Sequence, residues 1–222
     1  MAGKKIKALI LDVDGTLFDV TDRYVKSYED VLGRKVDGNK IIALRREGKS
    51  GLEIICTITG KAQGEARPID AIRKKLMNDN SLLHLDELLP GITEALEKLQ
   101  KSGIRLFALT MRNEQGVVDE FEKHGIKKYF EGIYSNDSPG EAGNPAAIKE
   151  KGLLRIIKQK HLNPSTTCIV GDTEAEIIAG RNSDILSVGV LTGLSSRELL
   201  AKAKPDAIVD SVEQLDSIKW NG

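Results

Sequence analysis

A short apolar segment that ends in two aspartates constrains this chain more than any other feature. Residues 8–11 read Ala-Leu-Ile-Leu, and Asp12, Val13, Asp14 and Gly15 follow directly. Side chains two positions apart on an extended segment point to the same side, so the carboxylates of Asp12 and Asp14 are expected to face one small volume. Two carboxylates held this close repel each other and require a proton or a cation between them. Oxygen donors of this kind favour a hard cation such as Mg²⁺.

Two later apolar segments also end in small or polar residues. Thr110 closes the segment 104–109, and Gly171-Asp172 follows the segment 167–170. Open parallel sheets bind ligands at the carboxyl ends of their strands, so these residues are expected to lie beside the two aspartates in a single site. An aspartate followed by glycine between apolar runs is also typical of a β-hairpin turn. Three polar strand ends favour the site over the hairpin.

The composition excludes several classes of partner. Lysine plus arginine and aspartate plus glutamate each number 33, so the formal net charge is zero and no global basic field attracts nucleic acid. The apolar run before Asp12 is too short to span a membrane or to form the core of a signal peptide. Two cysteines, Cys56 and Cys168, suit a reducing compartment. The sequence therefore predicts a cytoplasmic protein that binds neither nucleic acid nor membrane.

Strand and helix signals alternate over most of the chain, which predicts an α/β fold. Residues 136–145 contain Gly, Pro, Ser and Asn, which predicts a loop, and a helix is expected over 153–160. The segment 21–87 departs from the alternation because it is helix-like almost throughout. We therefore expect a core domain made of residues 1–20 and 88–222, with residues 21–87 inserted as a small helical domain.

The sequence Asp12-x-Asp14-Gly15-Thr16-Leu17 resembles the nucleophile motif of the haloacid dehalogenase (HAD) superfamily, in its phosphatase and phosphomutase members. The resemblance implies a Rossmann-like core with a parallel sheet and a helical cap domain inserted after this motif. It also implies that Asp12 is the nucleophile, that Asp14 is the general acid and base, and that Gly15 and Thr16 bind the substrate. Dehalogenases of the superfamily lack the second aspartate, so Asp14 argues against that chemistry.

Two further segments are similar to the second and third motifs of the superfamily. Thr110 at a strand end matches the second motif, whose hydroxyl binds a phosphate oxygen, and the neighbouring Met111 and Arg112 are expected to help bind the substrate. The third motif is a lysine near a helix start that neutralises the nucleophile and the phosphate. Lys151, which precedes Gly-Leu-Leu, resembles a lysine–glycine variant of this motif, and Lys149 is the alternative.

The segment Gly-Asp-Thr-x-x-Glu, which contains Asp172 and Glu176, resembles the fourth motif, in which acids after a glycine complete a metal site. Glu176 lies one helical turn after Asp172, on the same face. Aspartate is commoner at this place, so the longer Glu176 either contributes to the metal site or is an ordinary solvated acid. The resemblance implies a Mg²⁺ ion held by Asp12, Asp172 and the backbone carbonyl of Asp14, with Glu176 as a further candidate ligand.

Basic residues near glycines in the inserted segment are candidates for substrate specificity. Arg45 and Lys49 lie in the sequence Ala-Leu-Arg-Arg-Glu-Gly-Lys-Ser, where they can meet an anionic substrate. A charged, solvent-facing loop is the alternative reading of the same residues. The cap that carries them is expected to close over the site and to exclude water until substrate is bound.

The resemblance as a whole implies an Mg²⁺-dependent phosphatase, most like the phosphoglycolate phosphatase and β-phosphoglucomutase branch. The expected substrate is a small phosphorylated metabolite, phosphoglycolate-like or a sugar phosphate, and the protein is expected to be a monomer or a homodimer. A phosphomutase of the β-phosphoglucomutase type would keep both aspartates and protect the phosphorylated one from water. A non-catalytic protein that binds a phosphorylated ligand is the third alternative, because Glu176 and the third-motif lysine depart from the common pattern.

Overall fold

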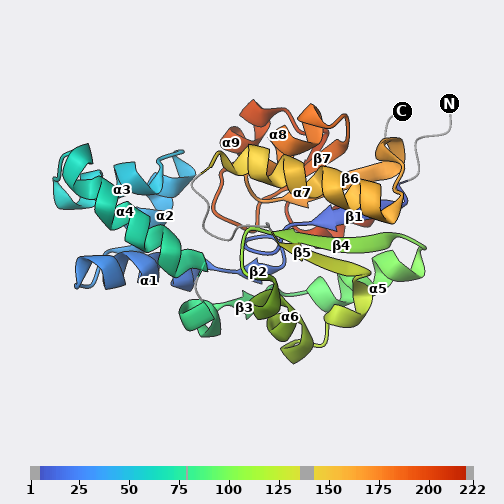
Figure 1. The fold of residues 1–222 in the computed structure, drawn as a ribbon, viewed down its shortest axis with the longest axis horizontal. Helices are drawn as coiled ribbons and strands as arrows, with labels where there is room; N and C mark the ends of the chain where they lie inside the picture. Colours follow the sequence, from blue (N-terminus) through green and yellow to red (C-terminus); the bar gives the residue numbers. More distant parts are fainter. Residues whose placement is uncertain (1–5, 79, 136–142, 219–222) are drawn as a thin grey trace.

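The computed structural model describes residues 6–78, 80–135 and 143–218. A six-stranded sheet forms its centre (Figure 1). The strands of this sheet are β1 (Ala8–Leu11), β4 (Arg105–Thr110), β5 (Gly132–Ser135), β6 (Thr167–Gly171), β7 (Leu186–Val190) and β8 (Ala207–Val209). Their order is β5-β4-β1-β6-β7-β8, and every neighbouring pair is parallel. The predicted α/β class with a parallel sheet is therefore confirmed.

The strand order places one end of β1 at a topological switch point. The chain extends the sheet from β1 through β4 to β5, and then returns to add β6, β7 and β8 on the other side of β1. Leu11 is paired with Ala108 of β4 and with Val170 of β6, so the carboxyl ends of these three strands lie at the same edge. Connections leave such a point toward opposite faces of the sheet, which opens a crevice there. The residues that follow β1 and β6 enter this crevice.

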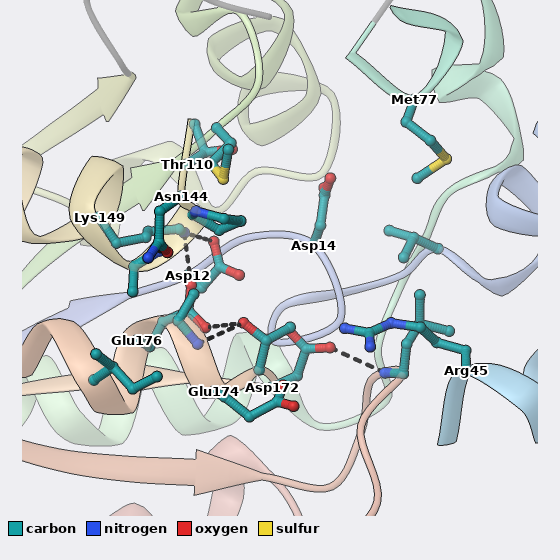
Figure 2. A pocket seen from close by; sticks show the side chains of 18 of the residues that line it. Asp12, Asp14, Arg45, Met77, Thr110, Asn144, Lys149, Asp172, Glu174 and Glu176 are labelled. Atoms are coloured by element: carbon teal, nitrogen blue, oxygen red, sulfur yellow. Dashed lines mark hydrogen bonds and ion pairs between the residues drawn. The ribbon is translucent and has the colours of Figure 1, made fainter. Parts of the chain in front are cut away.

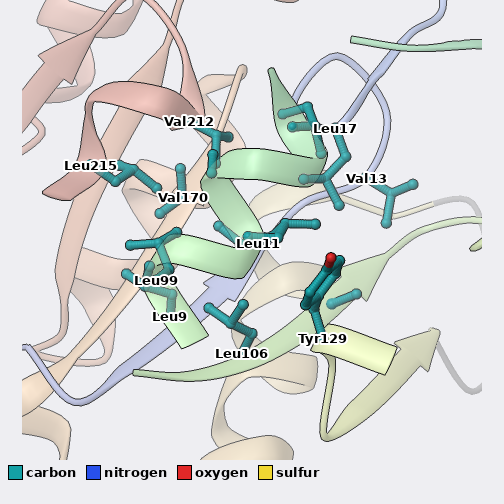
Figure 3. Packing of buried hydrophobic residues seen from close by; sticks show 14 of the residues in the cluster. Leu9, Leu11, Val13, Leu17, Leu99, Leu106, Tyr129, Val170, Val212 and Leu215 are labelled. Carbon is teal, nitrogen blue, oxygen red and sulfur yellow. The ribbon is translucent and has the colours of Figure 1, made fainter. Parts of the chain in front are cut away.

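Helices cover both faces of the sheet (Figure 1). They are α5 (Ile92–Lys101), α6 (Glu114–Lys123), α7 (Pro145–Lys160), α8 (Glu174–Asn182) and α9 (Arg197–Ala203), together with the 3₁₀ turns η2 (Lys127–Tyr129), η3 (Pro164–Thr166) and η4 (Val212–Ser217). Leu9 and Leu11 of β1 pack on one face with Leu99 of α5 (Figure 3). Ile10 packs on the opposite face with Leu153 of α7, as the alternation of strand side chains requires. Burial on both faces explains why β1 is a continuous apolar run.

The remaining helices lie to one side of the sheet, and we call them the cap (Figure 1). They are α1 (Thr21–Leu32), α2 (Gly38–Arg46), α3 (Gly51–Thr59), α4 (Gln63–Asn78) and the 3₁₀ turn η1 (Asn80–Leu85). Their buried apolar side chains form a cluster of their own around Tyr28, Ile41 and Ile54. The chain enters and leaves the cap through β2 (Phe18–Asp19) and β3 (Glu87–Leu88), which pair antiparallel. We retain the division into a core (1–20 and 88–222) and a cap (21–87) as a proposal.

Helix α7 begins earlier than the sequence pattern predicted. The expected helix covered 153–160, whereas α7 starts at Pro145 after Asn144, whose side chain accepts a hydrogen bond from the Ala146 backbone N–H. Asparagine followed by proline is a favourable helix start, because the proline N–H is not needed in the first turn. Residues 136–142 of the predicted loop lie outside the described residues. Within the described ranges, no helix is both long and apolar enough to cross a membrane.

Close packing of α7 on β4 generates a prediction about Gly152. A Cβ atom at Gly152 would lie 2.6 Å from Cδ1 of the buried Leu109. We expect Gly152→Ala to lower the free energy of unfolding by about 1–3 kcal/mol, because the core cannot absorb an extra methyl group without a shift. Urea denaturation measures the change.

Gly64 in α4 provides the matched control for this substitution. No heavy atom lies within 4 Å of a Cβ placed there. Gly64→Ala is therefore expected to be neutral or to stabilise the protein by up to about 1 kcal/mol, through helix propensity alone. Equal effects of the two substitutions would contradict the packing argument.

Candidate active site

A cavity of about 430 Å³ lies at the carboxyl edge of the sheet, between the core and the cap (Figure 2). The core contributes residues that follow β1, β4 and β6, and residues of the first turns of α7 and α8. The cap contributes Tyr24, Arg45 and Met77. Asp12, Thr110 and Asp172 all line this cavity. The polar strand ends therefore meet in one place, as the sequence predicted.

Asp12 is buried against a lysine of helix α7. The Lys149 Nζ contacts Oδ1 of Asp12, and it also donates to the carbonyl oxygen of Leu109 at 2.9 Å. The Lys149 side chain is only 3% exposed. Burial raises the pKa of the Asp12 carboxyl to about 7, although the ammonium group of Lys149 opposes this shift. Burial also opposes protonation of Lys149, but the neighbouring carboxylates raise its pKa above the usual value, so the lysine stays charged.

Asp172 occupies a space that two glycines leave open. A Cβ atom at Gly193 would lie 1.9 Å from Oδ2 of Asp172, and one at Gly15 would lie 2.5 Å from the same oxygen. Gly15 also has a φ of +76°, which other residues rarely adopt. The backbone N–H of Leu194 donates to Oδ2 at 3.0 Å. Burial and the carboxylates of Asp12 and Glu176 raise the pKa of Asp172 well above its usual value.

The carboxylates of Asp12, Asp172 and Glu176 form a group that fits a divalent cation. One oxygen of each lies within 4.8 Å of the other two, and all three residues are buried. Oxygen donors are the ligands that Mg²⁺ prefers. Oε1 of Glu176 lies 3.0 Å from Lys149 Nζ, and Oε2 accepts from the Thr173 hydroxyl at 2.6 Å. Glu176 therefore already has a protein partner on each oxygen, whereas among the described residues Asp172 faces the other two acids with one backbone donor, the N–H of Leu194.

Asp14 lines the same cavity but has different partners. Its Oδ2 lies 2.6 Å from Nη2 of Arg23, and its Oδ1 accepts from Nη1 of Arg112 at 2.9 Å. Burial opposes ionisation of Asp14, but the two guanidinium groups outweigh it and lower its pKa. In Figure 2 the Asp14 carboxylate is turned away from that of Asp12, toward the side of the cavity where Met77 lies. The Asp14 carboxylate therefore lies in the same cavity but outside the group formed by Asp12, Asp172 and Glu176.

Of the two candidate lysines, Lys149 rather than Lys151 lies at the acidic group. Lys149 contacts Asp12 and Glu176, whereas Lys151 is exposed and does not line the cavity. Residues two apart on a helix lie on nearly opposite sides of it, so only one of these lysines can face the site. Because α7 starts at Pro145, both lysines lie on the helix, and Lys149 lies on its buried face.

The other predicted substrate residues divide between the cavity wall and its surroundings. Met111 and Arg45 line the cavity. Thr16, Lys49 and Arg112 do not: Thr16 is fully buried, Lys49 is half-buried in the cap, and Arg112 is buried behind Asp14. The structure thus places Met111 and Arg45, but not these three residues, at the cavity wall.

Several residues at the site were not predicted from the sequence. Asn144 lines the cavity, and its position before a proline is a helix-start signal that could have revealed it. Arg23 pairs with Asp14 and also with Asp86, which lies 63 residues away along the chain. No local sequence pattern indicates an ion pair between residues this far apart, so the pair could not be predicted from the sequence.

Comparison with known proteins connects this geometry to a family. Residues 9–190 match the family model described as haloacid dehalogenase-like hydrolase. A phosphoglycolate phosphatase from Vibrio vulnificus (strain CMCP6) is 29% identical over 229 residues, which cover 97% of this chain and 96% of the relative. A solved structure of a candidate phosphatase from Clostridium difficile has a TM-score of 0.76 and 22% identity, covering 96% of this chain and 98% of that chain.

A further solved structure is that of a candidate β-phosphoglucomutase from Thermotoga maritima. Its TM-score is 0.64 and its identity 20%, with 94% of this chain and 96% of that chain covered. The two solved structures share the fold, and the family match runs from strand β1 to the end of β7, including Asp12, Asp14 and Asp172. The expected enzyme class, a HAD-like phosphatase, is confirmed by the family match and by the relatives named phosphoglycolate phosphatase. The chain therefore belongs to the haloacid dehalogenase-like hydrolase family.

Proposed function

We propose that this phosphatase hydrolyses a small phosphorylated metabolite that carries a second anionic group, such as phosphoglycolate, in a Mg²⁺-dependent reaction in the cytoplasm. One observation carries the proposal: the buried Asp12 stands between a charged lysine and a second buried aspartate, Asp172. A carboxylate flanked by a lysine and a cation site is arranged to meet a phosphate group.

In the first step, an oxygen of Asp12 attacks phosphorus and the bond between phosphorus and the leaving oxygen breaks. An aspartyl-phosphate forms, and the leaving oxygen takes a proton from Asp14. Lys149 and the hydroxyl of Thr110 face the transferring group and offset its negative charge. A Mg²⁺ ion held by Asp12, Asp172 and Glu176 would add positive charge at the same place.

In the second step, water attacks the aspartyl-phosphate and inorganic phosphate leaves. Asp14 takes the proton of that water, which restores its proton for the next cycle. The same residue thus serves as acid and then as base. Arg23 and Arg112 lower the pKa of Asp14, which favours the carboxylate that the second step needs.

The cap residue Arg45 supports the choice of substrate class. It lines the cavity, and its positive charge lies near enough to the acidic group to offset a small part of the rise in the pKa of Asp172. A substrate phosphate placed against Asp12 and Lys149 leaves the cap side of the cavity for the rest of the molecule. A guanidinium group there suits a carboxylate or a second phosphate. Relatives named phosphoglycolate phosphatase match this chain over nearly its whole length, which agrees with a carboxylate.

A panel of phosphomonoesters tests the function directly. We expect release of inorganic phosphate in the presence of Mg²⁺, with loss of activity on chelation by EDTA and recovery when Mg²⁺ is added back. Asp12→Asn should lower kcat by at least about a thousandfold while the protein remains folded by circular dichroism. A phosphomutase would need a bisphosphate activator and release little phosphate, and a binding protein would retain ligand without turnover. Unchanged turnover of Asp12→Asn would sink the proposal.

The two lysines of α7 form a matched pair for mutation. Lys149→Met is expected to reduce kcat/KM by about a hundredfold or more, because it removes a buried positive charge beside Asp12. Lys151→Met, two residues along the same helix, should change kcat/KM by less than about twofold, as expected for an exposed side chain. Steady-state kinetics with the best substrate of the panel measures both. A greater loss for the Lys151 variant would return the third-motif role to that residue.

Neighbouring arginines at the end of α2 test the specificity role of the cap. Arg45→Met should raise KM for a substrate with a carboxylate by about tenfold or more and leave KM for p-nitrophenyl phosphate nearly unchanged. Arg46 is exposed and does not line the cavity, so Arg46→Met should alter neither value. Equal effects of Arg45→Met on both substrates would remove Arg45 from substrate recognition.

A further inference from the structure

Asp14 belongs to a buried network of ion pairs that extends away from the acidic group. Arg112 Nη1 donates to Asp14 at 2.9 Å and lies 3.3 Å from Oδ2 of Asp86, while its Nη2 donates to Glu120 at 2.7 Å. Arg23 Nε donates to Oδ1 of Asp86 at 2.8 Å. The two arginines thus share two carboxylates. Asp14 is the member of this network whose side chain is most exposed, at 28%, and it is the one that lines the cavity.

The two arginines come from different parts of the fold. Arg23 lies in the first turn of cap helix α1, and Arg112 follows core strand β4. Asp86 lies directly before β3, where the chain leaves the cap. The network therefore spans both crossings between cap and core, at the antiparallel pair of β2 and β3.

Arg23 uses all three of its nitrogens on different partners. Nε donates to Asp86, Nη1 donates to the carbonyl oxygen of Met77 in the cap, and Nη2 forms an ion pair with Asp14 that is not a well-aligned hydrogen bond. The side chain is fully buried. Asp86 and Met77 thus hold the guanidinium group from two sides, and its third nitrogen is left facing Asp14. A buried charge with this many directed contacts has essentially one orientation.

We propose that Arg23 is a positioning residue that fixes the orientation of the Asp14 carboxyl, with Asp86 holding Arg23 in place. This inference rests on the proposed function, in which Asp14 gives its proton to the leaving oxygen as the bond to phosphorus breaks. Arg112 contacts the other carboxyl oxygen, so the two arginines grip Asp14 from both sides. Without Arg23, only the contact with Arg112 would hold the Asp14 carboxyl. The carboxyl would then point at the leaving oxygen for a smaller fraction of the time.

The dependence of rate on the leaving group tests this role. p-Nitrophenol leaves without help from an acid, whereas phenol is a poorer leaving group that gains from a proton. We expect Arg23→Gln to lower kcat/KM for phenyl phosphate about tenfold more than for p-nitrophenyl phosphate, since general acid catalysis is worth about 10²- to 10⁴-fold when complete. A merely structural role would lower both values equally. Equal losses, or no loss, would overturn the proposal.

Arg73 supplies a matched control within the cap. It is a buried arginine that pairs with Asp70 at 2.9 Å and packs over Tyr28, and it does not contact Asp14. Arg73→Gln should destabilise the protein without changing the ratio of the two kcat/KM values. If Arg23→Gln does not fold, Arg23→Lys replaces it, because lysine keeps the charge but cannot reach three partners at once. We then expect Arg23→Lys also to lower kcat/KM for phenyl phosphate more than kcat/KM for p-nitrophenyl phosphate.

The experiment separates failure of this inference from failure of the proposed function. If the wild-type protein releases no phosphate, or if Asp12→Asn keeps full activity, the proposed function fails and the role of Arg23 fails with it. If turnover depends on Asp12 but the Arg23 variants keep the wild-type ratio, only the positioning role is lost.

Discussion

The site depends on the crowding of three buried carboxylates around one lysine. Asp12, Asp172 and Glu176 converge within 4.8 Å, and Lys149 is the ammonium group that contacts two of them. With all three acids ionised, the lysine leaves two negative charges, which one divalent cation balances. Buried charges are unfavourable unless they are paired, and burial, together with the neighbouring carboxylates, raises the pKa of Asp12 and Asp172. A proton on one of the acids, or a cation beside them, offsets this repulsion.

The rest of the fold supplies room for this crowding. Glycines surround the acids: Gly15 and Gly193 flank Asp172, and a Cβ at Gly171 would lie 2.2 Å from Cγ of Glu176. The strand order then brings the acids together, because β1 lies between β4 and β6 and its carboxyl end is the switch point of the sheet. Packing of α7 on the sheet completes the group by carrying the lysine to Asp12. The strand order and the glycines thus provide the space in which the three carboxylates and the lysine meet.

The site residues that the sequence predicts are those that depend on neighbours close along the chain. Asp12 and Asp172 were predictable because each directly follows an apolar strand, and the parallel fold brings strand ends together. The choice between Lys149 and Lys151 depended on where α7 begins, and a loop-like composition before it concealed the first turns. Arg23 could not be predicted at all, because its partner Asp86 is 63 residues away and the pair is set by how the cap meets the core. Local patterns fix strands and motifs, whereas helix phase and domain contacts need the assembled fold.

The ion pairs around Asp14 show why an arginine is suited to position 23. A buried ionic network often contributes no more to stability than apolar side chains of similar size, so its place at the cap crossings favours a role in orienting Asp14. Arg23 satisfies Asp86, the Met77 carbonyl and Asp14 at once with three nitrogens on one rigid plane. A lysine offers a single nitrogen and would leave at least one of these acceptors without its partner. The planar guanidinium group of Arg23 therefore links the orientation of Asp14 to the position of cap helix α1, which carries Arg23.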